Sequence, residues 1–220
     1  MRKFLLSPVL FLAACTPVTP VIDSAPVEHV ESFYGERIPG TWIVTSDATP
    51  LTKNVTLNGV FCSQTDAYPV DIRPAFAKSV LDTFFPLAED VRGGQVGAPL
   101  PRGTTGAIHV RADALRLTMQ TTPAFVGHAF QTTIEIDMSF FVDGPHGRLL
   151  VRRATGTGRS DGNSGILCDG GGGIFASAAR NAIHDGLQHF AVEFASNSAI
   201  HRAFDSQREV TASVAPGERD

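Results

Sequence analysis

The chain has 220 residues, of which 43% are hydrophobic, and this length and content are sufficient for one folded domain with its own core. Its 18 lysines and arginines are outnumbered by 22 aspartates and glutamates, which gives a formal net charge of −4. Nucleic-acid binders neutralise phosphates with clustered cations, so this balance, without a basic run, argues against nucleic acid as a partner.

The first fifteen residues have the order of a secretory signal. Two basic residues at 2–3 precede an apolar run over 4–12, and the small pair Ala13-Ala14 stands directly before Cys15. The apolar run is too short to cross a bilayer as a helix, which takes about 20 residues. We therefore predict a signal peptide over residues 1–14.

The sequence Leu12-Ala13-Ala14-Cys15 resembles the lipobox of bacterial lipoproteins. The resemblance implies cleavage just before Cys15 and acylation of its sulfur, with palmitate among the chains; two chains give stable anchoring, at about 0.8 kcal/mol per buried CH2. Thr16 follows the cysteine, where this class retains inner-membrane members mostly with aspartate, so the resemblance favours the outer membrane, facing the periplasm. An ordinary signal peptide whose cleavage site abuts a cysteine is the alternative.

If Cys15 carries lipid, two cysteines remain, Cys62 and Cys168. An even pair in an oxidising compartment favours a disulfide. Closing a loop of about 100 residues would contribute at most ~4.7 kcal/mol in the chain-entropy model. We predict a Cys62–Cys168 disulfide, with two separate buried thiols as the alternative.

The chain divides into three parts after the signal. Residues 15–39 comprise the lipid site and a stretch rich in Pro, Val and Ser without a sustained period, which predicts a flexible tether. A single domain is predicted over 40–204. The polar end over 205–220 carries no period and is predicted to be disordered.

The first half of the domain is predicted to contain two strands and a helix. Runs rich in β-forming residues cover 40–46 and 54–60. Asp71 is the candidate cap of the helix and Pro74 lies in its first turn. Apolar residues then recur at helical spacing until Pro86, which should end or kink the helix.

The next stretch is predicted to form three strands. Residues 106–119 are β-like, but their apolar positions change parity near Ala114, which predicts a bulge or a break. Residues 131–142 alternate between apolar and polar, so one face of that strand should lie on a core. A hairpin turn over 143–147 leads to a return strand over 148–155.

A glycine-rich loop is predicted over 156–173, followed by the strongest amphipathic helix in the chain. The apolar stripe of this helix consists of Phe175, Ala179, Ile183, Leu187, Phe190 and Phe194. The resulting order, β-α-β-β-β-α, predicts the α+β class: a two-layer sandwich with two amphipathic helices on one face of a mostly antiparallel sheet.

This order, the lipobox and the Ala-rich segment 176–183 look like small envelope lipoproteins, of the YajG-like type and the auxiliary type of ABC lipid transporters. Gly156-Thr157-Gly158 is similar to a Gly-Thr-Gly turn of the former. The likeness spans 54–196, and the insert over 160–173 departs from it. The resemblance implies a non-catalytic accessory role in envelope assembly or transport, with an envelope protein as partner.

Residues 158–162 match G-x-S-x-G, the nucleophile elbow that would make Ser160 a hydrolase nucleophile. His184, His189 and His201 lie downstream as candidate bases. A glycine-rich loop, and not a helix, is predicted after Ser160, and no oxyanion glycine motif occurs. A serine hydrolase is therefore the remote alternative to a hairpin exit.

Two further groups of residues match a ligand-binding motif only in part: a glycine run that would bind an anion and a polar set that would bind calcium. The four glycines over 170–173 precede a helix, where backbone N–H groups bind anions, but no Gly-Lys-Ser/Thr follows. Asp161, Asn163 and Asp169 would supply oxygen to calcium, but the loop lacks the central glycine and the final acid of an EF-hand. We predict neither a metal nor a cofactor.

His184 and His189 are five residues apart, so they do not share a helix face and are predicted to be surface histidines. Phe175, Phe190 and Phe194 are predicted to be core residues. If they instead line a groove between helix and sheet, an acyl chain would fit there, and binding of a lipid or apolar ligand is the alternative function. In the absence of a complete catalytic set, we predict a non-enzymatic protein anchored to membrane lipid through Cys15.

Overall fold

The computed structural model describes residues 22–28, 30, 37–55, 68–123, 128–164 and 171–203. The elements in chain order are β1 (Ile38–Asp47), β2 (Thr52–Val55), β3 (Tyr68–Asp71), α1 (Arg73–Phe84), β4 (Ala88–Gly93), β5 (Gly106–Pro123), β6 (His128–Gly144), β7 (Gly147–Ser164) and α2 (Gly171–Ser196). A short helical segment over 198–203 follows α2.

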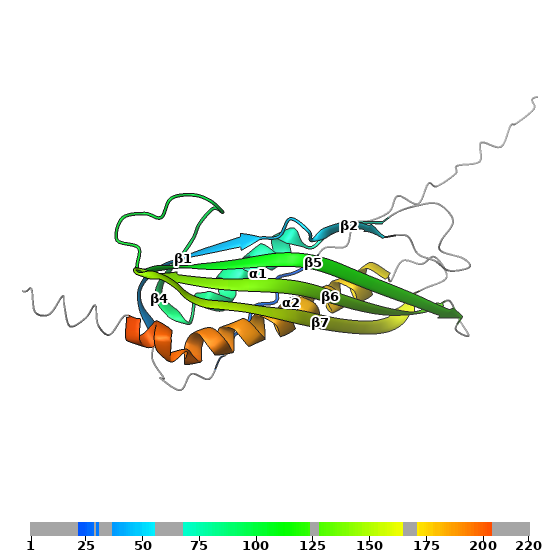
Figure 1. Cartoon of the computed structure of the whole chain (residues 1–220). Helices are drawn as coiled ribbons and strands as arrows, with labels where there is room; N and C mark the ends of the chain where they lie inside the picture. The colour runs from blue at the N-terminus through cyan, green and yellow to red at the C-terminus, as the bar shows by residue number, and fades with distance from the viewer. Residues whose placement is uncertain are drawn as a thin grey trace, which may run out of the picture.

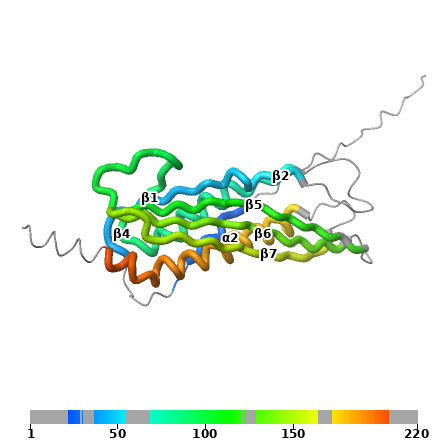
Figure 2. Tube along the Cα trace, viewed as in Figure 1, coloured from blue at the N-terminus to red at the C-terminus, as the bar shows by residue number. Residues whose placement is uncertain are grey.

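The main sheet has five strands in the order β4-β1-β5-β6-β7. β1 is parallel to both β4 and β5, and the long strands β5, β6 and β7 form an antiparallel meander. β2 and β3 form a separate antiparallel pair. α1 packs on β1 and β4, while α2 lies along β6 and β7 (Figures 1 and 2). The structure confirms the α+β two-layer sandwich, although the sheet is mixed.

Strand β4 is missing from the predicted order. Its sequence, Ala-Glu-Asp-Val-Arg-Gly, is short and polar, which is typical of an edge strand and leaves no alternating pattern to detect. The chain leaves the sheet after β1, passes through α1 and re-enters the sheet as β4, which lies parallel to β1. Parallel neighbours need such a crossover connection, which usually contains a helix.

The predicted loop over 156–173 is wrong in its first half. β7 continues to Ser164, and its residues pair with β6 from Gly147 to that end. Glycines made this stretch resemble a loop in the sequence. In the structure they allow α2 to approach the strand closely, as the packing of Gly156 and Gly158 shows.

The predicted irregularity in β5 is confirmed. The register of β5 against β6 shifts between Ala112 and Ala114. The extra residue, Asp113, reverses the parity of the strand, so that Val110 before it and Leu115 after it both belong to the core side.

Helix α1 begins after Asp71 and ends before Pro86, close to the predicted limits. Ile72 is the N-cap residue, so Asp71 stands one position earlier than predicted. Its carboxylate still accepts a hydrogen bond from the backbone N–H of Arg73, at 3.1 Å. A side-chain oxygen therefore satisfies one of the free N–H groups of the first turn.

Part of the tether predicted over 15–39 packs against the folded domain. Residues 22–28 lie against the two helices, and Val27 is only 1% exposed. β1 begins at Ile38, two residues before the predicted domain boundary. The predicted disordered tail over 205–220 lies outside the described residues.

The core between the layers is rich in aromatic side chains. Trp42 of β1 meets Phe194 of α2 edge to face, with ring centroids 5.4 Å apart. Phe140 of β6 stacks on Phe84 of α1 at 5.5 Å and on Phe190 of α2 at 4.9 Å. These contacts join both helices to the sheet, which fixes the layers relative to each other. Among the described helices, none combines the length and apolarity needed to cross a membrane.

Candidate functional site

The three cysteines are outside the part of the chain that the structure describes. Cys15, Cys62 and Cys168 belong to the intervals 1–21, 56–67 and 165–170. The lipid attachment at Cys15 and the Cys62–Cys168 disulfide therefore remain predictions.

Ser160 does not lie on a nucleophile elbow. It is an internal residue of β7, paired with Thr132 of β6. An elbow requires a sharp turn from strand to helix that exposes the serine, and here the strand continues for four more residues. The nucleophile elbow on which the hydrolase interpretation of Ser160 depends is therefore absent from this position.

The candidate histidines are separated along α2 and its extension. His184 and His189 are both exposed on α2. His184 Nδ1 lies 3.1 Å from the carbonyl oxygen of Pro26, and His201 Nε2 lies 3.0 Å from that of Ala195. These contacts give His184 and His201 structural partners within the protein.

The proposed calcium ligands are divided between a strand and an undescribed interval. Asp161 and Asn163 are exposed residues of β7, while Asp169 is outside the described residues. Within the described ranges, no group of three or more acidic, histidine or cysteine side chains is placed to hold a metal. Gly171–Gly173 form the first turn of α2, so most of the glycine run is helical.

The aromatic stripe of α2 is core, as the first of its two interpretations predicts. Phe175, Phe190 and Phe194 are all buried. Because Phe140 and Trp42 pack against two of these rings, the described interface between α2 and the sheet is filled by protein. The described interface between α2 and the sheet therefore contains no groove for an acyl chain. The alternative function, binding of a lipid or apolar ligand between helix and sheet, has no site in this interface.

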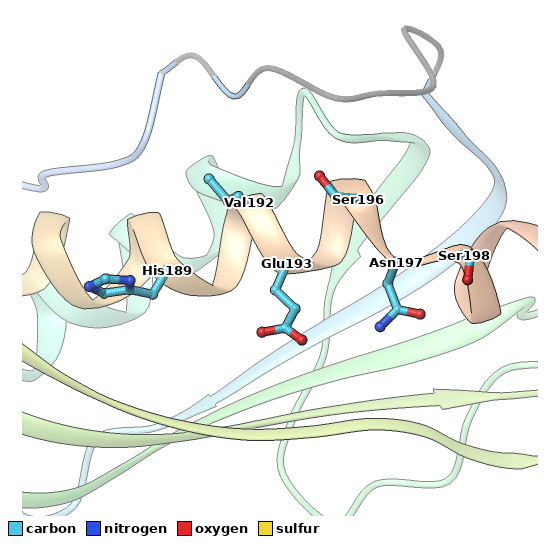
Figure 3. Close-up of a pocket in the computed structure, with 6 residues that line it drawn as sticks. All are labelled: His189, Val192, Glu193, Ser196, Asn197 and Ser198. Atoms are coloured by element: carbon cyan, nitrogen blue, oxygen red, sulfur yellow. The ribbon is translucent and has the colours of Figure 1, made fainter.

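An open pocket of ≈ 510 Å³ lies at the end of α2 (Figure 3). It is lined by His189, Val192, Glu193, Ser196, Asn197 and Ser198. Glu193 points toward the sheet, where its carboxylate accepts a hydrogen bond from Arg152 Nε at 2.7 Å, while Val192 and Ser196 point away. The polar groups do not converge on one point, so the pocket lacks the geometry of an active site.

The face of the sheet opposite the helices carries a network of charged side chains. Arg116 of β5 donates to Glu135 at 2.9 Å and to both oxygens of Asp137 at 2.7 and 2.8 Å. Thr155 of β7 donates to Asp137 as well, at 2.6 Å. The Arg116 guanidinium and the Thr155 hydroxyl hold the pKa of Asp137 below its usual value. Ionised side chains of β5 and β6 and a hydroxyl of β7 are thus joined by hydrogen bonds across this open face.

An aromatic side chain interrupts the open face near the β6–β7 hairpin. Phe141 is approached by Arg148, whose Cζ is 4.8 Å from the ring centroid, and by Arg111 at 5.6 Å. The ring of His109 stacks beside it at 5.9 Å, and His109 Nδ1 lies 2.8 Å from Thr45 Oγ1. We name Phe141, His109, Arg111 and Arg148 the Phe141 cluster.

The composition of the Phe141 cluster is that of a protein contact surface. Arginine and aromatic residues are enriched at interfaces and at their energetic centres. Val151 pairs with Phe141 from β7 and is 47% exposed, which extends the apolar area. Partial burial lowers the pKa of His109. The neutral ring then adds no charge to the cluster at neutral pH.

Sequence reasoning missed the Phe141 cluster. The alternation in 131–142 assigned odd positions to the polar face, and Phe141 is an aromatic residue at an odd position. This break in the pattern was the available signal. Its arginine neighbours become visible only when the register of the three strands is known.

No protein-family model matches this chain, and the search of curated proteins gave no match. The solved structures that resemble this chain include two that each match 87% of it. A Xanthomonas campestris protein of the DUF330 family is 12% identical with a TM-score of 0.42, and 99% of its chain is covered. A neuraminyllactose-binding hemagglutinin homolog from Helicobacter pylori is 10% identical with a TM-score of 0.47, and 100% of its chain is covered. Likeness at these levels does not bear on function.

Proposed function

We propose that this protein is a lipid-anchored periplasmic lipoprotein of the outer membrane, serving as a non-enzymatic binding component in cell-envelope assembly or transport. The order of charge, apolar run, small pair and cysteine over residues 1–15 carries the proposal. Two or more acyl chains on Cys15 would hold the body at the membrane without any spanning helix.

Retention of the protein in membranes tests the anchor. The full-length protein is expressed in a Gram-negative host, and its membrane fraction is compared with that of Cys15→Ser. We expect the native protein to sediment with outer membranes and to incorporate labelled palmitate, and the variant to do neither. An inhibitor of lipoprotein signal peptidase should make the precursor accumulate. Unchanged sedimentation of Cys15→Ser would contradict the anchor.

The Phe141 cluster supports the binding role, because it places an aromatic ring and two arginines on the solvent face of a rigid sheet. Both arginines are also paired, Arg111 with Asp113 and Arg148 with Asp143, which keeps their guanidinium groups in position over the ring. The surface is thus organised before any partner binds, which reduces the entropy cost of association.

The binding role is tested by replacing Phe141 with alanine in the lipidated protein. The amount of cross-linked complex recovered from solubilised envelope should fall at least tenfold in Phe141→Ala. Phe85→Ala is the matched control, because Phe85 is 60% exposed and belongs to the helix layer. Equal loss in both variants, or none in either, would contradict a partner at the cluster.

A further inference from the structure

Residues 22–28, which we name the N-terminal strap, are bound to helix α1 by hydrogen bonds from their backbone N–H groups to side-chain hydroxyls of the helix. The N–H of Ala25 donates to Ser79 Oγ at 2.8 Å, and the N–H of Val27 donates to Thr83 Oγ1 at 3.0 Å. The Val27 side chain is 1% exposed and belongs to the main core. The strap is therefore an integral part of the domain.

The two hydroxyls have the spacing that an extended strand requires. Ser79 and Thr83 are one helical step of four residues apart, about 6 Å along the axis of α1. Ala25 and Val27 are two residues apart, which is about 6.6 Å in an extended chain. Both hydroxyl residues are fully buried in α1. The Ser79 hydroxyl also donates to the carbonyl oxygen of Ala75 at 2.6 Å, so it donates within α1 and accepts from the strap.

Helix α2 holds the other side of the strap. His184 Nδ1 is 3.1 Å from the carbonyl oxygen of Pro26, and Arg180 is 3.6 Å from the carboxylate of Asp23. The strap thus lies between the two helices. Figure 3 shows this part of the chain on the side of α2 that faces away from the sheet.

This docking limits the reach of the lipid anchor. Ile22 is seven residues after Cys15, a separation of at most about 25 Å in a fully extended chain. A free tether continuing to Pro39 would reach about 85 Å. With lipid on Cys15, at most seven residues would separate the anchor from the strap, and the strap itself lies on the helix layer.

We infer that the N-terminal strap orients the anchored body, with the α1–α2 layer toward the bilayer and the open sheet face turned away from it. The inference rests on the proposed lipidation of Cys15. It places the Phe141 cluster, which belongs to the open face, on the side that faces the periplasm. A partner would then approach the cluster without contacting the membrane.

Hydrogen exchange tests the strap independently of the lipid. In full-length Cys15→Ser, the amides of Ala25 and Val27 should exchange at least tenfold more slowly than in an unstructured peptide. Ser79→Ala/Thr83→Val should raise their exchange at least tenfold. The matched control is Ser198→Ala/Thr118→Val, which removes the same two hydroxyl types from exposed positions. Exchange at the unstructured rate in the parent protein would overturn the strap.

Energy transfer to the bilayer tests the orientation. A fluorescent amino acid replaces Val192 on the helix layer, which is 41% exposed, or Val151 on the sheet face, which is 47% exposed. The lipidated protein is reconstituted in phosphatidylethanolamine–phosphatidylglycerol vesicles that contain an acceptor lipid. Transfer should be stronger from position 192, and Ser79→Ala/Thr83→Val should reduce the difference.

Each outcome has a separate meaning. Equal transfer from positions 192 and 151 in the vesicle-bound protein overturns the orientation and leaves the anchor standing. Vesicle binding that persists in Cys15→Ser overturns the proposed anchor and the orientation together. Should the α1 double variant not fold, Arg180→Gln/His184→Gln weakens the strap from the exposed side of α2 and is expected to reduce the difference in the same direction.

Discussion

A Cβ atom on Gly158 would lie 1.9 Å from the backbone carbonyl oxygen of Ala178, far inside any non-bonded contact distance. Gly156 stands in the same relation to Ala182, at 2.0 Å. The opposing atoms belong to the backbone of α2, so no flexible side chain can yield. Glycine at these two positions of β7 is thus the condition for α2 to lie directly on the strand.

We expect Gly158→Ala to destabilise the protein by about 3 kcal/mol or more, because the methyl group must push α2 away from β7. Gly173→Ala is the control, since no atom lies within 4 Å of a Cβ there and the residue is helical. That change should be neutral or stabilise by about 0.5–1 kcal/mol. Urea denaturation measures both. Similar midpoints for the two variants would contradict the close approach of helix and strand.

The aromatic core makes a second prediction. Phe194 is fully buried and contacts Trp42, Phe84 and Phe140. Phe194→Ala should cost about 3–5 kcal/mol through lost burial and the cavity that remains. Phe85→Ala, at a position that is 60% exposed, should change stability by less than about 0.5 kcal/mol. Thermal and urea unfolding compare the two, and equal losses would show that Phe194 is not core.

His109 predicts a dependence of stability on pH. Burial lowers the pKa of His109 below its ordinary value of 6.5, although the Asp47 carboxylate acts in the opposite direction. The unfolded chain then binds a proton more readily than the folded protein. Stability from this residue is fully present above pH 6.5 and decreases as the pH falls toward the lowered pKa of the folded state.

The test compares urea midpoints at pH 7.5 and 5.5. The native protein should lose more stability between these values than His109→Gln, which has no titrating ring at this position. His146→Gln, in the exposed β6–β7 turn, is the control and should behave like the native protein. An unchanged pH dependence in His109→Gln would mean that the pKa of His109 is the same in the folded and unfolded states.

Periodicity was sufficient to predict the elements whose two faces differ. The alternation around Ile134 and Ile136 indicated β6, and the change of parity near Ala114 indicated the bulge in β5. Both signals are local, because they depend on which residues face water and which face the core.

Features set by partners distant in sequence were not predictable in this way. Gly156 and Gly158 favour a loop by local propensity, and the close contact with α2 overrides that propensity. Val27 lies in a Pro-rich stretch typical of a linker, and its position is explained by contacts with distant residues: the hydroxyls of Ser79 and Thr83 on α1 and the core that its side chain joins. The Phe141 cluster depends on strand register, which no single strand reveals.

The Cys62–Cys168 disulfide gives the last prediction. The mature Cys15→Ser protein, denatured without reductant, should react with no equivalent of a thiol-specific maleimide, whereas two separate thiols would react with two equivalents. Reduction should slow the protein in electrophoresis, because an opened loop of about 100 residues lets the chain expand, and should lower stability by at most ~4.7 kcal/mol. Cys62→Ser and Cys168→Ser should each show the slower mobility without reductant and expose one thiol. If either variant keeps the faster band, the two cysteines are not paired with each other. The disulfide would then no longer support the oxidising compartment that the lipobox implies.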